Sequence, residues 1–113
     1  MSYEVTRNEL FAAIELKTDK LDTLVAPSLK SEFVLLNNEG IKNFILDLGS
    51  AKYCDSSGLS AILIANRLCK NADGRLVICN LQDAVRKLIS ISQLDSVISI
   101  ASSADDARTL IQQ

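Results

Sequence analysis

The segment Leu46-Asp-Leu-Gly-Ser-Ala-Lys-Tyr-Cys-Asp-Ser-Ser-Gly-Leu59 decides the fold, because it joins a buried strand to a buried helix. The mostly apolar residues 43–48 are typical of a strand covered on both faces. The apolar residues that follow predict a buried helix over about 57–70. The two adjacent serines therefore lie where a strand ends and a helix begins, which is where ligands and modifications gather in α/β proteins.

The rest of the chain repeats the plan of a strand followed by a helix. Further strands are predicted at 10–16, 75–79 and 96–100, with a short edge strand at 3–6. Further helices are predicted at 24–36, from 81 with a frayed end at 90–95, and from 103 onward. Such alternation favours right-handed crossovers. We therefore expect an α/β fold, a single domain over 1–113, with a central mostly parallel β-sheet of about four to five strands flanked by about four helices.

The composition fits one compact domain and gives no electrostatic reason for binding nucleic acid. The chain has 113 residues, of which 48% are hydrophobic, and its formal net charge is -2. No apolar stretch approaches the length of a membrane span, about 18 residues, and the first residues lack the pattern of a signal peptide. We expect a cytoplasmic protein whose partners are proteins or small molecules, with no direct nucleic acid contact and no membrane insertion.

Several classes of catalytic and metal site are missing from the sequence. Histidine is absent, which removes Ser-His and Cys-His nucleophile pairs and the common imidazole metal sites. The glycines are scattered singly, so no phosphate-binding loop or dinucleotide fingerprint is present. Cys54, Cys69 and Cys79 lack metal-ligand spacing and are interpreted as small buried hydrophobes kept reduced. We expect no catalytic residue, no metal, no cofactor and no enzymatic activity.

Three segments together resemble a known family. The segment 46–59 is similar to the signature of the STAS domain of bacterial anti-sigma factor antagonists, and residues 21–29 and 76–88 agree with it in order and spacing. The chain departs from the family at Asp19, where a glycine is usual, and at Val25, where a hydroxyl residue is favoured. Aspartate tolerates a left-handed backbone better than most residues, so the turn at Asp19 is expected to survive.

The resemblance implies a role in transcription regulation by partner switching. It implies that Ser56 accepts a phosphoryl group from an anti-sigma factor that is itself a serine kinase. The unphosphorylated protein would bind that kinase and release a sigma factor, phosphorylation would abolish binding, and a serine phosphatase would restore the active form. ATP and Mg²⁺ would belong to the kinase. The partner-binding residues that the resemblance implies are Asp22, Asp55, Ser56, Ser57 and Gly58.

Elementary electrostatics agrees with a switch at Ser56. A phosphate at a helix start meets unpaired backbone N–H groups and the positive end of the helix dipole, so the fold should tolerate it. A docked partner should not, because about two negative charges would be added beside Asp55. If the loop of Asp22 lies adjacent, its carboxylate adds to the repulsion. Repulsion and desolvation cost would then eject an acidic or apolar partner surface.

Each site residue also has a plain structural interpretation. Ser56 can be an N-cap, Ser57 can be the cap or a first-turn residue with a weaker claim as acceptor, and Asp22 can cap the helix over 24–36. Asp55 either orients the hydroxyl or favours the helix N-terminus, and Gly58 lets another backbone or a partner approach closely.

The alternative function is a constitutive one. In that case the chain is a non-catalytic STAS scaffold subunit, which docks on an ATPase of a lipid-transport complex through the same helix end without any turnover of phosphate.

Overall fold

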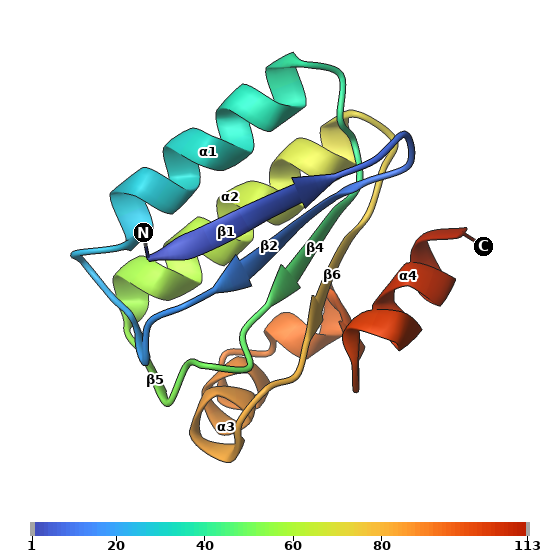
Figure 1. The fold of residues 1–113 in the computed structure, drawn as a ribbon. Coiled ribbons are helices and arrows are strands. Elements are labelled where there is room, and N and C mark those ends of the chain that lie inside the picture. Colours follow the sequence, from blue (N-terminus) through green and yellow to red (C-terminus); the bar gives the residue numbers. More distant parts are fainter. Residues whose placement is uncertain (1, 113) are drawn as a thin grey trace.

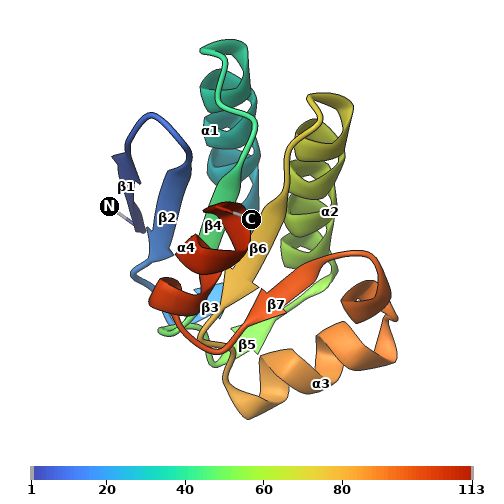
Figure 2. The same ribbon diagram turned by 90° about the vertical axis from the view of Figure 1, so that its right-hand side faces the viewer.

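A five-stranded sheet with the order β1-β2-β4-β6-β7 forms the centre of the molecule in a computed structural model, which describes residues 2–112. The strands are β1 (Tyr3–Arg7), β2 (Ala12–Leu16), β4 (Phe44–Asp47), β6 (Leu76–Cys79) and β7 (Ser99–Ala101). β1 pairs antiparallel with β2, and every other neighbouring pair is parallel (Figure 2). The predicted α/β fold with a mostly parallel sheet is confirmed, and β1 is the edge strand whose direction the sequence left open.

Helices cover both faces of this sheet. They are α1 (Ala26–Asn38), α2 (Ser56–Asn71), α3 (Asp83–Ile91) and α4 (Ala104–Gln112), and a 3-10 turn, η1, spans Leu94–Ser96. α1 and α2 pack on one face and α4 on the other, while α3 lies at the end of the sheet where the parallel strands finish (Figure 1). Within residues 2–112 no helix is both long and apolar enough to span a bilayer.

The alternation of side chains along the strands produces two hydrophobic cores. In β4, Phe44 and Leu46 face α1 and α2, whereas Ile45 between them faces α4. The ring of Phe33 in α1 packs on that of Phe44 with centroids 5.1 Å apart. The buried stripe of α2 consists mainly of small residues at helical spacing, namely Gly58, Ala61, Ile62, Ala65 and Cys69. Small residues let this helix lie close to its neighbours.

Several predicted boundaries move by a few residues. The helix predicted at 24–36 begins at Ala26, with Pro27 in its first turn, where a missing N–H costs little. The helix predicted from 81 begins at Asp83, and the predicted frayed end contains the last turn of α3 and then η1. The strand predicted at 96–100 is shorter and later, because Ser96 belongs to η1.

Two short strands were not predicted. β3 (Lys20–Leu21) and β5 (Tyr53–Cys54) pair in parallel as a separate two-stranded sheet. Two residues are too short for a recognisable period, so only the folded chain reveals this pairing. The pairing matters because β5 leads directly into α2.

Candidate functional site

The β3–β5 pair brings together two loops that are distant in the sequence. Leu21 pairs with Cys54, and the N–H of Asp55 donates to the carbonyl oxygen of Leu21 at 3.2 Å. Asp22 follows Leu21, just as Asp55 follows Cys54, so the two aspartates emerge side by side from the paired strands. The condition that the Asp22 loop lies adjacent to the serines is therefore met.

Asp55 is the N-cap of α2. Its backbone is extended, its Oδ1 accepts the N–H of Gly58 at 3.0 Å, and its carbonyl oxygen accepts the N–H of Leu59 at 3.0 Å. Ser56 is the first residue of the helix and its side chain is exposed, while Ser57 is half-buried in the same turn. The interpretation of either serine as the cap is wrong, because the aspartate occupies that position. Ser56 is therefore an exposed residue at the start of α2, and its hydroxyl is not needed for the cap.

Gly58 lies beneath the site. It is buried, and a Cβ atom placed on it would overlap the carbonyl oxygen of Leu21 and stand 2.7 Å from Sγ of Cys54. The residue therefore permits the close approach of another backbone, and that backbone is β3. Gly58 allows β3 to lie against the start of α2.

Asp22 orders the loop before α1 without being its N-cap. Its Oδ1 accepts the N–H of Leu24 at 3.1 Å, and its carbonyl oxygen accepts the N–H groups of Val25 at 3.1 Å and Ala26 at 2.8 Å. The N-cap position of α1 is Val25, which makes no side-chain capping bond. The interpretation of Asp22 as the cap is therefore wrong, and the residue instead forms an Asx turn that leads into the helix.

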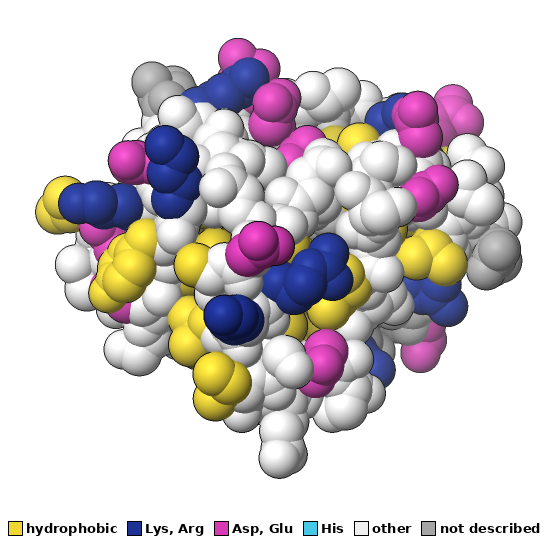
Figure 3. All heavy atoms as spheres, turned by 90° about the horizontal axis from the view of Figure 1, so that it is seen from below, with side chains coloured by type: hydrophobic (Ala, Val, Ile, Leu, Met, Phe, Trp, Pro, Cys, Tyr) yellow, Lys and Arg dark blue, Asp and Glu magenta, His cyan; other side chains and the backbone are white. Residues whose placement is uncertain are grey.

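Two exposed apolar residues adjoin the site, and sequence reasoning missed both. Leu24 is 88% exposed in the loop after Asp22, and Tyr53 is 52% exposed on β5. The sequence placed Leu24 inside a helix, but the helix begins two residues later and leaves this side chain in solvent. The face seen in Figure 3 shows hydrophobic side chains beside both basic and acidic ones. Exposed apolar side chains among polar ones can serve as contact points for another protein.

The three cysteines are packing residues in the folded chain. Burial raises the pKa of Cys54 to about 11, with a further contribution from the negative charge of Asp55. Burial likewise raises the pKa of Cys69 and of Cys79 to about 12. The thiols stay protonated at neutral pH, which makes them poor nucleophiles and metal ligands. Among residues 2–112 no group of three or more acidic or cysteine side chains is placed to hold a metal ion.

Comparison with known proteins decides the family. The family model of the STAS domain matches residues 3–107. The chain belongs to the STAS domain family. A Bordetella bronchiseptica protein named as an anti-sigma factor antagonist, BtrV, is 32% identical to this STAS domain over 82 residues, which cover 73% of this chain and 71% of BtrV. The predicted membership of the anti-sigma factor antagonist family is confirmed.

Solved structures share the fold of this STAS domain. An anti-sigma factor antagonist from Thermotoga maritima superposes with a TM-score of 0.87 at 18% identity, covering 98% of this chain and 95% of that one. The antagonist SpoIIAA in its unphosphorylated form gives 0.84 at 19% identity, covering 97% and 96%. At these identities the likeness concerns the architecture alone.

Proposed function

We propose that this STAS domain, taken as one unit over 1–113, is an anti-sigma factor antagonist that binds an anti-sigma factor and is switched off by phosphorylation of Ser56. The observation that carries the proposal is the exposed position of Ser56 as the first residue of α2, next to an N-cap that Asp55 supplies. A relative of the chain, BtrV, is named as an antagonist. SpoIIAA has also been solved in a phosphorylated form, and this chain superposes on that structure with a TM-score of 0.76.

At the position of Ser56 a phosphate should hardly affect the stability of the fold, although it should weaken the binding of a partner. The first N–H groups of a helix lack intrahelical partners, and the helix dipole favours negative charge there, so the folded domain accommodates a phosphate. Asp55 keeps its capping bond to Gly58, because that bond does not involve the serine hydroxyl. Phosphorylation therefore changes the surface of the domain and leaves its packing intact.

A bound partner meets the opposite situation. Leu24 and Tyr53 offer apolar contact area beside the serine, and burying them against a partner would bring Ser56 into the interface. A dianion of about two charges in that interface would have to be desolvated next to Asp55 and Asp22. Binding is lost because the free-energy cost of burying these unpaired charges exceeds the favourable free energy of the apolar contact.

The proposed partners follow from this chemistry. The anti-sigma factor is a serine kinase that supplies ATP and Mg²⁺, and a serine phosphatase returns the domain to its binding form in the cytoplasm. The domain itself contributes an acceptor hydroxyl and a docking surface, and performs no catalysis.

The test combines intact-mass measurement with binding. The purified domain is incubated with a candidate anti-sigma factor kinase and ATP, and we expect the mass of one phosphoryl group, lost in Ser56→Ala and kept in the matched variant Ser57→Ala. Ser56→Asp should weaken binding to the kinase. Phosphate on Ser57→Ala and Ser56→Ala alike would contradict the assigned acceptor. Tight and unchanged binding of Ser56→Asp to a transporter ATPase would instead establish the scaffold function.

A further inference from the structure

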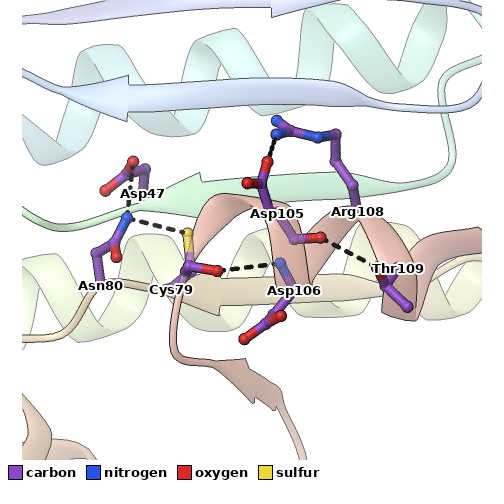
Figure 4. A network of polar contacts seen from close by, with 8 residues as sticks. Asp47, Cys79, Asn80, Asp105, Asp106, Arg108 and Thr109 are labelled. Atoms are coloured by element: carbon purple, nitrogen blue, oxygen red, sulfur yellow. Dashed lines mark hydrogen bonds and ion pairs between the residues drawn. The ribbon is translucent and has the colours of Figure 1, made fainter.

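Polar side chains at the ends of β4 and β6 hold the connection between β4 and β5. Asp47, the last residue of β4, accepts the N–H of Gly49 through Oδ1 at 2.9 Å. Its Oδ2 accepts the Nδ2 group of Asn80 at 3.1 Å (Figure 4). Gln82 donates from Nε2 to the carbonyl oxygen of Gly49 at 2.7 Å. The N–H and the carbonyl oxygen of Gly49 are thus both bonded to side chains. We call Asp47, Asn80 and Gln82 the Gly49 clamp.

The local backbone agrees with this arrangement. Asn80 has φ +59, a left-handed conformation that asparagine and aspartate tolerate better than most residues. A Cβ atom on Gly49 would stand 3.1 Å from Oδ1 of Asp47 and 3.4 Å from Cβ of Asn80, so a side chain there would press on the clamp. Unusual backbone that the surroundings hold in place is commonly found near functional sites.

The clamped connection leads directly to the phosphoacceptor. Leu48 donates its N–H to the carbonyl oxygen of Cys79 at 3.1 Å, and Lys52 donates its N–H to that of Asp19 at 2.8 Å. The connection is therefore attached to β6 at one end and to the segment before β3 at the other. β5 and the first turn of α2 follow, so these attachments determine where Ser56 stands.

We infer that the Gly49 clamp consists of positioning residues for the modification of Ser56. This inference rests on the proposed function, because it assigns the clamp a role in how a kinase meets the serine. The clamp fixes the start of the connection to the end of β6, while backbone bonds to Asp19 and Leu21 hold β5 beside β3. Loss of one clamp bond loosens the connection ahead of β5 and lets the serine move while the two cores stay packed. The kinase then encounters the hydroxyl in its reactive position for a smaller fraction of the time.

An exchange of donor and acceptor tests the clamp. Asp47→Asn places an amide donor opposite the Nδ2 donor of Asn80, and the double variant Asp47→Asn/Asn80→Asp restores one donor and one acceptor without changing the net charge. We expect Asp47→Asn to lower kcat/KM for phosphorylation by about fivefold, the effect of one lost hydrogen bond, and the double variant to recover most of it. Amide hydrogen exchange at residues 49–55 should accelerate and recover in parallel.

A matched control separates positioning from general stability. Asn43 bridges the opposite end of the sheet, where its Nδ2 donates to the carbonyl oxygen of Leu10 at 3.0 Å. Asn43→Asp removes that donor and should lower the resistance to urea without changing kcat/KM at Ser56. If Asp47→Asn fails to fold, Gln82→Ala removes only the bond to Gly49 and replaces it in the test.

The outcomes distinguish the clamp from the switch itself. Unchanged kcat/KM and exchange rates in Asp47→Asn, or no recovery in the double variant, would overturn the inference. A wild-type domain that no candidate kinase phosphorylates would contradict the proposed function. In that case, exchange that accelerates only at 49–55 and recovers in the double variant still supports the clamp, and unaltered exchange overturns it.

Discussion

The carbonyl oxygen of Leu21 occupies the space that a Cβ atom on Gly58 would need, and Sγ of Cys54 lies 2.7 Å from the same position. The start of α2 therefore packs against β3 through backbone on both sides. We expect Gly58→Ala to lower the free energy of unfolding by about 1–3 kcal/mol, because either β3 or the helix must shift. Urea denaturation measures this change.

The control for this substitution, Ser60, lies two residues further along the helix. Ser60→Ala also introduces alanine into α2, where helix propensity alone should leave stability within about 0.5 kcal/mol or raise it slightly. Equal stability of Gly58→Ala and wild type would show that the backbone contact is not restrictive.

Removal of the N-cap should weaken α2 at its first turn. Asp55→Ala loses the bond from the N–H of Gly58 and should cost about 1 kcal/mol, whereas Asp55→Asn keeps an acceptor oxygen and most of the stability. Urea denaturation of the three proteins gives the comparison. A loss as large in Asp55→Asn as in Asp55→Ala would mean that charge, and not the cap geometry, stabilises this helix start.

Leu24 should matter for binding and hardly at all for folding. Because its side chain is 88% exposed, Leu24→Ala should change stability by less than about 0.5 kcal/mol. If it lies in the partner interface, affinity for the anti-sigma factor should fall at least fivefold, or about 1 kcal/mol, by titration calorimetry.

Leu35 offers the matched control for that measurement. It is 58% exposed on α1 and lies toward the end of the helix that is remote from Ser56. Leu35→Ala should bind like wild type. Equal losses in the two variants would argue for a docking surface along α1 instead of around the serine.

The cysteines should react slowly until the chain unfolds. At about pH 8 an ordinary thiol is partly ionised, but burial holds the pKa values of Cys54, Cys69 and Cys79 at about 11, 12 and 12. A colourimetric thiol reagent should label the native protein slowly and all three cysteines rapidly in denaturant. Fast labelling of Cys54 in the native state would show that the β5 segment opens readily.

The same pKa values predict that the stability of the fold decreases as the pH rises above about 9. The pKa values of the thiols are higher in the folded state than the ordinary value of 9.0, so the folded chain retains protons that the unfolded chain loses. The stability that these protons contribute is complete below about pH 9 and is lost as pH rises through the folded values. In Cys69→Ala the loss over this interval should be smaller than in wild type, measured by urea denaturation at each pH.

The longer strands and helices could be predicted from the sequence. Short elements whose formation depends on contacts with distant parts of the chain could not. The apolar run 43–48 is short and nearly continuous, as in a strand buried on both faces, and the buried stripe of α2 recurs at helical spacing. The β3–β5 pair has two residues on each side, so its existence depends on loops that only the folded sheet brings together.

The identity of the cap was lost for the same reason. Asp55, Ser56 and Ser57 are all good N-cap residues, and the sequence offers no means of choosing among them. The choice is made by β5, which keeps Asp55 in extended backbone and starts the helix at the next residue. The exposure of Ser56 is a consequence of a pairing that the sequence did not reveal.

The spacing between Ser56 and Gly58 also limits how such a chain can change in length. Each residue of a helix advances the direction of its side chain by about 100°, so these two point to nearly opposite sides of α2. A single-residue deletion or insertion between Asp55 and Gly58 would rotate the acceptor inward or push a bulkier residue against β3. Length variation among chains of this kind should therefore accumulate in the turns at the opposite end of the sheet, and the two-residue interval should stay fixed.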